Sequence, residues 1–399
     1  MDITRLIFAG MICLAASPPV SAMPPPSVVT GLEAITSVSR EGQGNEAAAQ
    51  GWKAVTSAGV PALIPTLAAF PNASPTAANW LRTAVDAIVE AELKAGRPLP
   101  LRELNAFLTD TKQHPAARRI AFEILSRQAP EETAKKLLTM ITDPSVEIRR
   151  DAIAARMKAA ESLTGNAKKT EYELLFAASR DKDQAEELQK LLKATGGNAD
   201  LTRHFGYITE WQVVGPFDNT DGTGFAKAYP PEAGVDFAAK YRGKTGEEMT
   251  WKPVQSAATY GTIDLNVDLD KFKDACAYAA TDIIIEKDTP AEIRLNTPNS
   301  VQVFLNGAKV YEHEEYHHGD RFDQYSVTVT LKAGKNRLLV KVCQNDQKEP
   351  WAQKWQFALR ICDATGGALP LKQIVIRDGQ EMTIAPGAIK PLPPKEESK

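Results

Sequence analysis

A β-hairpin is predicted by the stretch Val301-Gln302-Val303-Phe304-Leu305-Asn306-Gly307-Ala308-Lys309-Val310-Tyr311. Two runs rich in apolar residues flank Asn306-Gly307, and both turn residues tolerate the positive φ that a two-residue type I′ turn requires. A hairpin of this kind joins neighbouring antiparallel strands. This half of the chain is therefore expected to be built from an antiparallel sheet.

Neighbouring segments repeat the strand pattern. Apolar and polar residues alternate with a period of two, as in strands that bury one face of an antiparallel sheet and expose the other. The apolar positions are Ile263, Leu265, Val267 and Leu269; Val327, Val329 and Leu331; Leu338, Val340 and Val342; and Trp355, Phe357, Leu359 and Ile361. No helical pattern separates these strands, so residues 201–370 are predicted to form a two-sheet β-sandwich.

The preceding part of the chain, residues 31–200, is predicted to be helical. It is rich in Ala, Leu, Glu, Lys and Arg, and apolar residues such as Ile120 and Ile124 recur at helical spacing. Pro115, Pro130 and Pro144 indicate helix starts, because proline in the first turn loses no hydrogen bond. We expect about eight to ten helices joined by short turns.

Part of the helical region repeats. Arg118-Arg119-Ile120-Ala121 matches Arg149-Arg150-Asp151-Ala152, which begins 31 residues later, and a helix is expected ahead of each copy, at residues 104–108 and 137–141. Helix pairs at such a period resemble HEAT-like repeats, in which each pair packs on its neighbours and the array forms a solenoid. An irregular helical bundle is the alternative. The predicted fold class is thus a helical repeat solenoid followed by an antiparallel β-sandwich.

The second half resembles the galactose-binding-like jelly roll found in large secreted bacterial proteins. The residues that carry the resemblance are the strand Gly334–Val342, the Asn306-Gly307 turn, the pattern Trp355-x-Phe357-x-x-Arg360 and the opening strand Trp211–Phe217. It implies a jelly-roll connection of the strands. Domains of this class bind glycans, bind other proteins or brace a neighbouring domain, so the resemblance alone does not choose a function.

The two ends of the chain carry their own signals. Arg5, the apolar run 6–16 and the small-residue end Val20-Ser21-Ala22 predict a signal peptide over residues 1–22 and a secreted or periplasmic protein. Residues 23–30 are expected to be a linker. Residues 371–399 are expected to be a disordered tail, because their end is rich in Pro, Lys and Glu. No later stretch approaches the roughly 20 apolar residues of a transmembrane helix.

Charge and cysteine content exclude two classes of protein. The formal net charge is −3 and both signs are mixed along the chain, so no basic stripe is available to bind nucleic acid. Beyond residue 22 the cysteines are Cys276, Cys343 and Cys362, which allow at most one disulfide within the chain. The stability of the domains must therefore come from ordinary hydrophobic cores.

A zinc-hydrolase pattern, H-E-x-x-H, is matched by His313-Glu314-Glu315-Tyr316-His317. That chemistry needs a helix, since only a helix brings both imidazoles to one Zn²⁺ beside the catalytic glutamate. Predicted strands lie on both sides, and the segment has no apolar stripe, so we expect a polar loop. The alternatives are a zincin-like metallohydrolase that uses His313, Glu314 and His317, and adventitious zinc binding by His313, His317 and His318.

Two loops combine aromatic and polar residues, as sites that bind sugars do. The candidate ligand-binding residues are Trp351, Tyr316, Arg321, Asn345, Asp346 and Glu349. For Trp351 the alternative is a core plug at the end of the sandwich. The segment 217–222 is rich in oxygen ligands that suit a structural calcium ion, but its spacing favours an ordinary turn.

Other catalytic signatures are missing: the chain contains no G-x-S-x-G elbow, no phosphate-binding loop and no paired-cysteine motif. We therefore expect a secreted, non-catalytic binding protein without a cofactor. The β-sandwich would recognise a carbohydrate or another cell-surface polymer, with the helical repeats as scaffold. The alternative is a protein-interaction scaffold, in which the helical repeats hold another exported protein.

Overall fold

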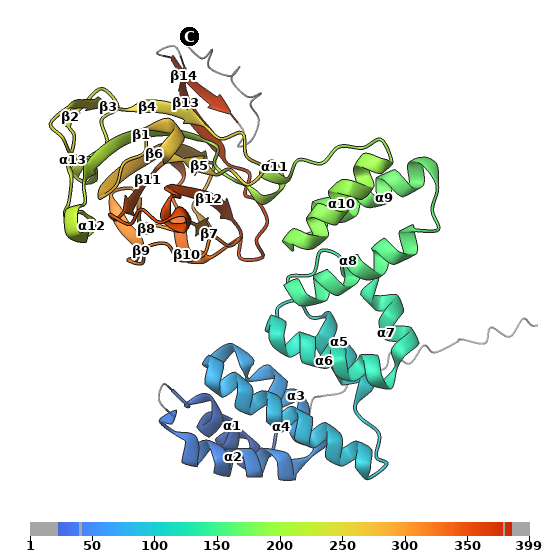
Figure 1. Cartoon of the computed structure of the whole chain (residues 1–399). Coiled ribbons are helices and arrows are strands. Elements are labelled where there is room, and N and C mark those ends of the chain that lie inside the picture. Colours follow the sequence, from blue (N-terminus) through green and yellow to red (C-terminus); the bar gives the residue numbers. More distant parts are fainter. Residues whose placement is uncertain (1–22, 40–41, 378–379, 385–399) are drawn as a thin grey trace, which may run out of the picture. The chain divides into compact units, whose positions relative to one another are not determined.

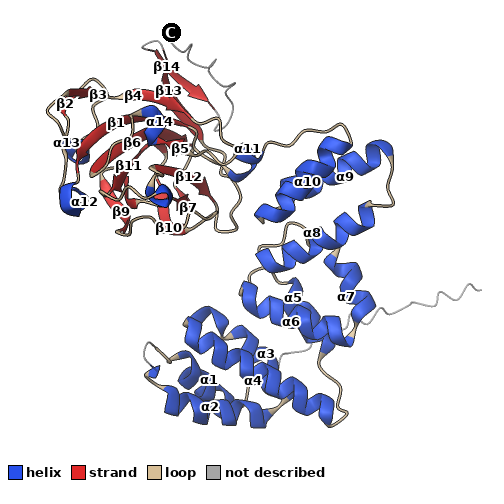
Figure 2. Cartoon of the chain, viewed as in Figure 1, coloured by secondary structure: helices blue, strands red, loops and turns tan. Residues whose placement is uncertain are grey.

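The computed structural model describes residues 23–39, 42–377 and 380–384. Within them, helices fill the chain from Pro26 to Phe205 and antiparallel sheets follow, as Figures 1 and 2 show. The chain divides into two compact units, Met1–Ala134 and Lys135–Lys399, which are described separately below. The predicted signal peptide lies outside the described residues. Among those residues, no helix is long and apolar enough to span a membrane.

The first unit consists of helices. They are α1 (Pro26–Thr36), α2 (Asn45–Ala58), α3 (Val60–Ala68), the 3₁₀ turn η2 (Phe70–Asn72), α4 (Pro75–Lys94), α5 (Leu101–Thr109), α6 (Pro115–Gln128) and the start of α7 (Pro130–Leu137). The linker predicted over residues 23–30 is wrong from residue 26 onward. Pro26 occupies a first-turn position of α1, and Val28 is fully buried, so this segment already belongs to the helical core.

Four helices of the second unit precede its sheets: α8 (Val146–Ala160), α9 (Gly165–Ala178), α10 (Lys182–Ala194) and α11 (Leu201–Phe205). Two details differ from the expectations. Residues 138–142 form turns where a helix over 137–141 was predicted, and Pro144 lies two residues before α8 instead of in its first turn. Proline disfavours helical geometry in the residue before it, which keeps Asp143 outside the helix. Ser145 then occupies the N-cap position of α8.

The two matched arginines of the predicted repeat have the same role in the structure. Arg118 is buried, and its Nε donates to Leu108 O at the end of α5 (2.8 Å). Arg149 is also buried, and its Nε donates to Asp143 O in the turn before α8 (2.7 Å). Each guanidinium thus satisfies carbonyl groups that the preceding segment leaves unpaired. The solenoid itself stays a prediction.

The larger sheet of the second unit has the order β14-β13-β6-β11-β8-β9, and β1 pairs with both β4 and β6. All the pairings are antiparallel. The strands are β1 (Glu210–Asp218), β4 (Lys252–Gln255), β6 (Ala275–Ile285), β8 (Ser300–Leu305), β9 (Ala308–His313), β11 (Gly334–Gln344), β13 (Lys372–Arg377) and β14 (Gln380–Ile384).

A second, four-stranded sheet has the order β10-β7-β12-β5. Its strands are β5 (Ile263–Asp264), β7 (Thr289–Asn296), β10 (Tyr325–Leu331) and β12 (Gln356–Cys362). One core joins the two sheets, because Ile293 and Leu359 of the smaller sheet pack in the same buried cluster as Val303 and Val340 of the larger one. The chain therefore contains the predicted antiparallel sandwich. Its jelly-roll connectivity stays a prediction.

The predicted hairpin at Asn306-Gly307 is confirmed. Asn306 has φ = 52° and Gly307 has φ = 83°, both in the left-handed region that a type I′ turn requires. The strands β8 and β9 pair from Leu305–Ala308 to Val301–His313. This register ends β9 at His313 and so fixes where the following polar loop begins.

The strand predicted over 263–269 is wrong beyond Asp264. The chain turns there into the short helix α14 (Leu265–Asp268), whose first turn is capped by the Asp264 side chain. Val267 is 78% exposed, although the alternation placed it in the core. Aspartate and asparagine at alternate positions fit the polar face of a strand, but they also form turns and helix caps, and the caps prevail here.

The outer face of β11, which was expected to be exposed, is buried. It packs under the segment 217–251, which contains the 3₁₀ turn η3 (Thr220–Gly222), α12 (Thr223–Ala226), α13 (Pro230–Ala233), β2 (Lys240–Arg242) and β3 (Glu248–Thr250). Lys341 is fully buried beneath this segment. Its Nζ donates to Phe225 O (2.9 Å) and forms an ion pair with Glu232 (3.0 Å).

The tail begins later than predicted. Residues 372–377 form β13, which pairs with β6, and residues 380–384 form β14. Buried positions at Gln373 and Val375 anchor this hairpin to the larger sheet. Residues 385–399, which carry the Pro- and Lys-rich end, lie outside the described residues.

Candidate functional site

Loops from three parts of the chain meet at one end of the sandwich. Asn219, which follows β1, is fully buried, and its Nδ2 donates both to Tyr316 OH (3.1 Å) and to Gln344 O (3.0 Å). Its backbone N–H donates to Asp274 O (2.8 Å), and Asp274 N–H in turn donates to Asn345 O (3.0 Å). One buried amide therefore ties together the loop after β1, the β9–β10 loop and the end of β11.

His317 joins the β9–β10 loop to the β11–β12 loop. Its backbone has φ = 57°, and its N–H donates to Pro298 O (2.6 Å). Its Nε2 donates to Asn345 Oδ1 (2.6 Å), and its ring lies 5.6 Å from the Trp351 indole at an interplanar angle of 80°. We call the residues Tyr316, His317, Asn345, Asp346, Glu349 and Trp351 the Trp351 cluster.

Trp351 is not a core plug. It lies in the 3₁₀ turn η4 (Pro350–Ala352) with 61% of its surface exposed. The end of the core is filled instead by Trp355, which is fully buried and whose Nε1 donates to Val342 O (3.2 Å). The neighbouring Ala352 is also buried, so it anchors the turn that displays the indole.

Charged groups lie on and beside the loop that holds the indole. Asp346 and Glu349 are exposed on the same loop as Trp351. Beside them, Lys273 donates Nζ to Ala352 O (2.8 Å). Burial lowers the pKa of Lys273, and the negative charges of Glu349 and Asp346 oppose this shift. The cluster and the neighbouring Lys273 thus offer an aromatic face, two carboxylates, a side-chain amide and an ammonium group within one set of loops.

Arg321 does not belong to this cluster. It is exposed near the other end of the β9–β10 loop and acts electrostatically on the Tyr325 hydroxyl. The neighbouring Asp323 is half-buried in an ion-pair network. Its carboxylate lies 2.6 Å from Arg360 Nη2 and 2.8 Å from Arg294 Nη1, and it fixes the C-terminal end of the loop to β12 and β7.

The zinc-hydrolase geometry is contradicted, as expected from the context of the motif. His313 is the last residue of β9, and residues 314–317 form no helix. His317 faces Asn345 and Trp351, whereas His313 forms its contacts with Glu315, His318 and Tyr325. The two imidazoles of the motif therefore have different surroundings, and Glu314 does not lie between them on a shared helical face.

The segment 217–222 contains the end of β1, up to Asp218, and the 3₁₀ turn η3 (Thr220–Gly222), in agreement with the turn favoured from its spacing. Asp218 Oδ1 accepts from Thr220 N–H (3.2 Å) and from Thr220 Oγ1 (2.7 Å), and it lies 3.4 Å from Lys244 Nζ. These contacts lower the pKa of Asp218 despite the opposing effect of its partial burial. The carboxylate thus has hydrogen-bond and ion-pair partners within the chain.

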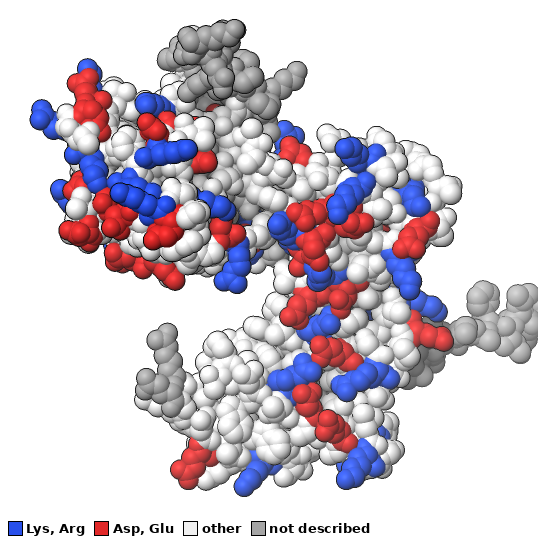
Figure 3. Space-filling view, in the orientation of Figure 1, with Lys and Arg blue, Asp and Glu red and all other residues white. Residues whose placement is uncertain are grey.

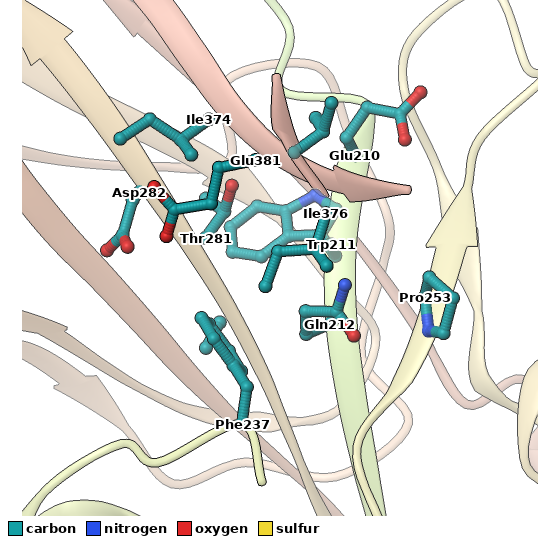
Figure 4. A pocket seen from close by; sticks show the side chains of 12 residues that line it. Glu210, Trp211, Gln212, Phe237, Pro253, Thr281, Asp282, Ile374, Ile376 and Glu381 are labelled. Carbon is teal, nitrogen blue, oxygen red and sulfur yellow. The ribbon is translucent and has the colours of Figure 1, made fainter. Parts of the chain in front are cut away.

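Figure 4 shows a pocket between β1, β6 and the hairpin β13–β14. Its volume is about 20 Å³, which is enough for one water molecule and too small for a sugar. Asp282, on its edge, already pairs with Arg337 and Lys335, each at 2.7 Å. This pocket therefore does not compete with the Trp351 cluster as a ligand site.

Both signs of charge are interspersed over the face of the chain seen in Figure 3. The visible surface of the sandwich carries neither a continuous basic patch nor a continuous acidic one. This distribution agrees with the formal net charge of −3 and gives no support to a polyanionic partner.

Two contributors to the site were not predicted. Asn219 was considered only as part of a turn, and its bond to Tyr316 spans 97 residues. The sequence around Lys273 did not indicate that this residue belongs to a binding site. Only the fold brings it to the loop that holds Glu349, so no pattern in the chain could have identified it.

Comparisons with known proteins found likenesses to solved structures at low sequence identity. No protein-family model and no curated protein matches this chain. Among solved structures, a family 35 carbohydrate binding module from an environmental isolate is 17% identical, with a TM-score of 0.16, over 24% of this chain and 72% of that one. The β-glucosidase from Kluyveromyces marxianus in complex with glucose is 12% identical, with a TM-score of 0.24, over 38% of this chain and 16% of that one.

A β-glucuronidase of an uncultured Clostridium species is 14% identical, with a TM-score of 0.22. That match covers 44% of this chain and 33% of the enzyme. TM-scores this low do not establish a shared function. The chain is therefore a helical region followed by an antiparallel β-sandwich, and its function has to be inferred from its own site.

Proposed function

We propose that this chain is an exported binding protein that recognises a carbohydrate or another cell-surface polymer through the Trp351 cluster. The observation that carries the proposal is the Trp351 indole, 61% exposed on a loop whose base is anchored by buried residues. Export is proposed from the leader-like segment 1–22. A binding role, not a catalytic one, is proposed because the polar residues around the indole form no recognisable catalytic arrangement.

The chemistry of the cluster suits a sugar. The apolar face of a pyranose ring can stack on an exposed indole, while its hydroxyl groups need acceptors and donors at the edge of the ring. Asp346 and Glu349 supply carboxylate acceptors, and Asn345 and Lys273 supply donors. Because the indole and both carboxylates are exposed, the ligand would lie across the surface, as a polymer chain does.

The cluster is also held in place before any ligand binds. Asn219 and His317 connect the loops by hydrogen bonds of 2.6–3.1 Å. Loops already ordered in this way lose less conformational entropy on binding, which favours affinity. This rigidity distinguishes the cluster from an exposed tryptophan on an unsupported loop.

The test is retention of the chain on a panel of insoluble polysaccharides and cell-wall preparations. Wild type should be retained by at least one of them, and Trp351→Ala should be released. Met382→Ala is the matched control: Met382 is 49% exposed on β14, and that hairpin pairs with the opposite end of β6 from the Trp351 cluster. If no polymer retains wild type, or if Trp351→Ala is retained equally, the proposal is wrong.

A further inference from the structure

Three side chains near the end of β9 form a cluster suited to a metal ion. His313, Glu315 and His318 each place one donor atom within 4.8 Å of the others. His313 Nε2 lies 3.0 Å and His318 Nδ1 lies 4.0 Å from Glu315 Oε2. The two imidazole rings lie 5.4 Å apart. Tyr316 and His317, which belong to the Trp351 cluster, contact Asn219, Asn345 and Trp351 instead.

His318 supplies an independent sign of a missing partner. Its Nδ1 is buried and has no hydrogen-bond partner. Buried polar atoms are normally satisfied, so an unpaired ring nitrogen calls for an explanation. At 4.0 Å from Glu315 Oε2 it is too far for a direct hydrogen bond, but the separation leaves room for an ion that both atoms could approach.

The second ring nitrogen of His318 faces Tyr325. The Tyr325 hydroxyl is joined to His318 Nε2, and it also accepts from Gln324 Nε2 (3.3 Å). When Nε2 carries the ring proton and donates it to Tyr325, Nδ1 presents a lone pair toward Glu315. Histidine ligands of metals are usually oriented by a hydrogen bond of this kind from the second ring nitrogen.

We propose that His313, Glu315 and His318 bind a divalent transition-metal ion, with zinc as the best match. Two imidazoles and one carboxylate suit zinc better than calcium or magnesium, which prefer oxygen ligands. Zinc bonds of about 2.0–2.2 Å place tetrahedral ligand atoms roughly 3.3 Å apart. The exposed side chains of Glu315 (55%) and His313 (36%) can adjust to close the set, and water would complete the coordination.

This site differs from the zinc-hydrolase motif in two of its three residues. The motif would use Glu314 and His317, whereas the geometry selects Glu315 and His318 together with the shared His313. An ion held here would also fix the loop segment that displays Tyr316 and His317. Its presence does not depend on the proposed carbohydrate function, so each proposal can fail without the other.

The experiment is calorimetric titration of the untagged, metal-free chain with Zn²⁺, with Co²⁺ as a spectroscopic probe of tetrahedral coordination. Wild type should bind one Zn²⁺ per chain. Glu315→Gln should weaken binding at least about 100-fold, because it removes a ligand, whereas loss of a supporting partner costs about 10–100-fold. Tyr325→Phe, which removes such a partner, should weaken binding about 10-fold. Glu314→Gln is the matched control and should bind as wild type does.

Circular dichroism of each variant measures directly whether it folds, and His313→Ala provides a second ligand variant. The proposal is overturned if wild type binds no Zn²⁺, if folded Glu315→Gln and His313→Ala both bind as wild type does, or if Glu314→Gln loses binding to the same extent as Glu315→Gln.

Discussion

Asp323→Asn should destabilise the sandwich by about 3 kcal/mol, the lower end of the 3–5 kcal/mol expected when one partner of a buried ion pair is removed. Arg360 is 1% exposed, and Asp323 is its anionic partner through two hydrogen bonds, of 2.7 and 2.6 Å. Asparagine keeps the shape but leaves the guanidinium charge uncompensated. The lower end of this range of destabilisation applies because Asp323 is itself 18% exposed. In addition, Arg360 keeps its hydrogen bonds to Phe205 O and Gly366 O.

The assay is urea unfolding followed by tryptophan fluorescence, since Trp211 and Trp355 lie in the core of the sandwich. With a slope of about 3 kcal/mol per molar urea, the midpoint should fall by about 1 M while the slope stays constant. Asp346→Asn, an exposed carboxylate, should shift stability by less than about 0.5 kcal/mol. If Asp323→Asn unfolds within that same margin of wild type, the buried ion pair does not stabilise the sandwich as argued.

Three further predictions concern polar groups that the fold buries wholly or in part. Lys341→Met should cost about 3 kcal/mol, because the Glu232 carboxylate loses its cationic partner and keeps only the hydrogen bond from the Tyr278 hydroxyl. Adding Glu232→Gln should recover part of that loss in a double-mutant cycle measured by urea unfolding. Burial lowers the pKa of His204 to about 4 in the folded chain, whereas an exposed histidine of the unfolded chain has a pKa of about 6.5. As the pH falls below about 6.5, the unfolded chain therefore binds a proton at His204 before the folded chain does. Unfolding free energy should therefore drop by about 2 kcal/mol between pH 7.5 and 5, and His204→Gln should remove that part of the pH dependence. Asn219→Ala should lower the free energy of unfolding by about 2 kcal/mol and weaken any polymer binding, because it removes the hydrogen bonds that connect Tyr316 to the end of β11. An unchanged free energy of unfolding and unchanged polymer binding would contradict the bridging role of Asn219.

The strands that the alternation predicted well are those in which local pattern and burial agree. Val329 and Leu331 of β10, and Leu338, Val340 and Val342 of β11, all face the shared core. The failure at 263–269 arose because Asp264 and Asn266 fit a strand and a turn equally well by local pattern. The burial of Lys341 could not be predicted either, since it depends on a segment more than a hundred residues away along the chain.

The candidate site was also predictable only where the local sequence pattern agrees with burial. Trp351 and Trp355 are four residues apart, and only Trp355 follows the alternation of β12, so its place in the core could be expected. The exposure of Trp351 could not be predicted from the sequence and is known only from the structure. The histidines show the opposite case: spacing paired His313 with His317, but the turn at His317 brings His318 to His313 instead.

The dissociation constant of Trp351→Ala for a polysaccharide that retains wild type tests the central claim most directly. Loss of the stacking face should cost about 2 kcal/mol, the usual threshold for a residue that dominates an interface, which corresponds to about 30-fold weaker binding. Trp351→Phe, which keeps an aromatic face, should recover part of this loss. A Trp351→Ala variant that binds within about twofold of wild type would contradict the assignment of the Trp351 cluster as the binding site.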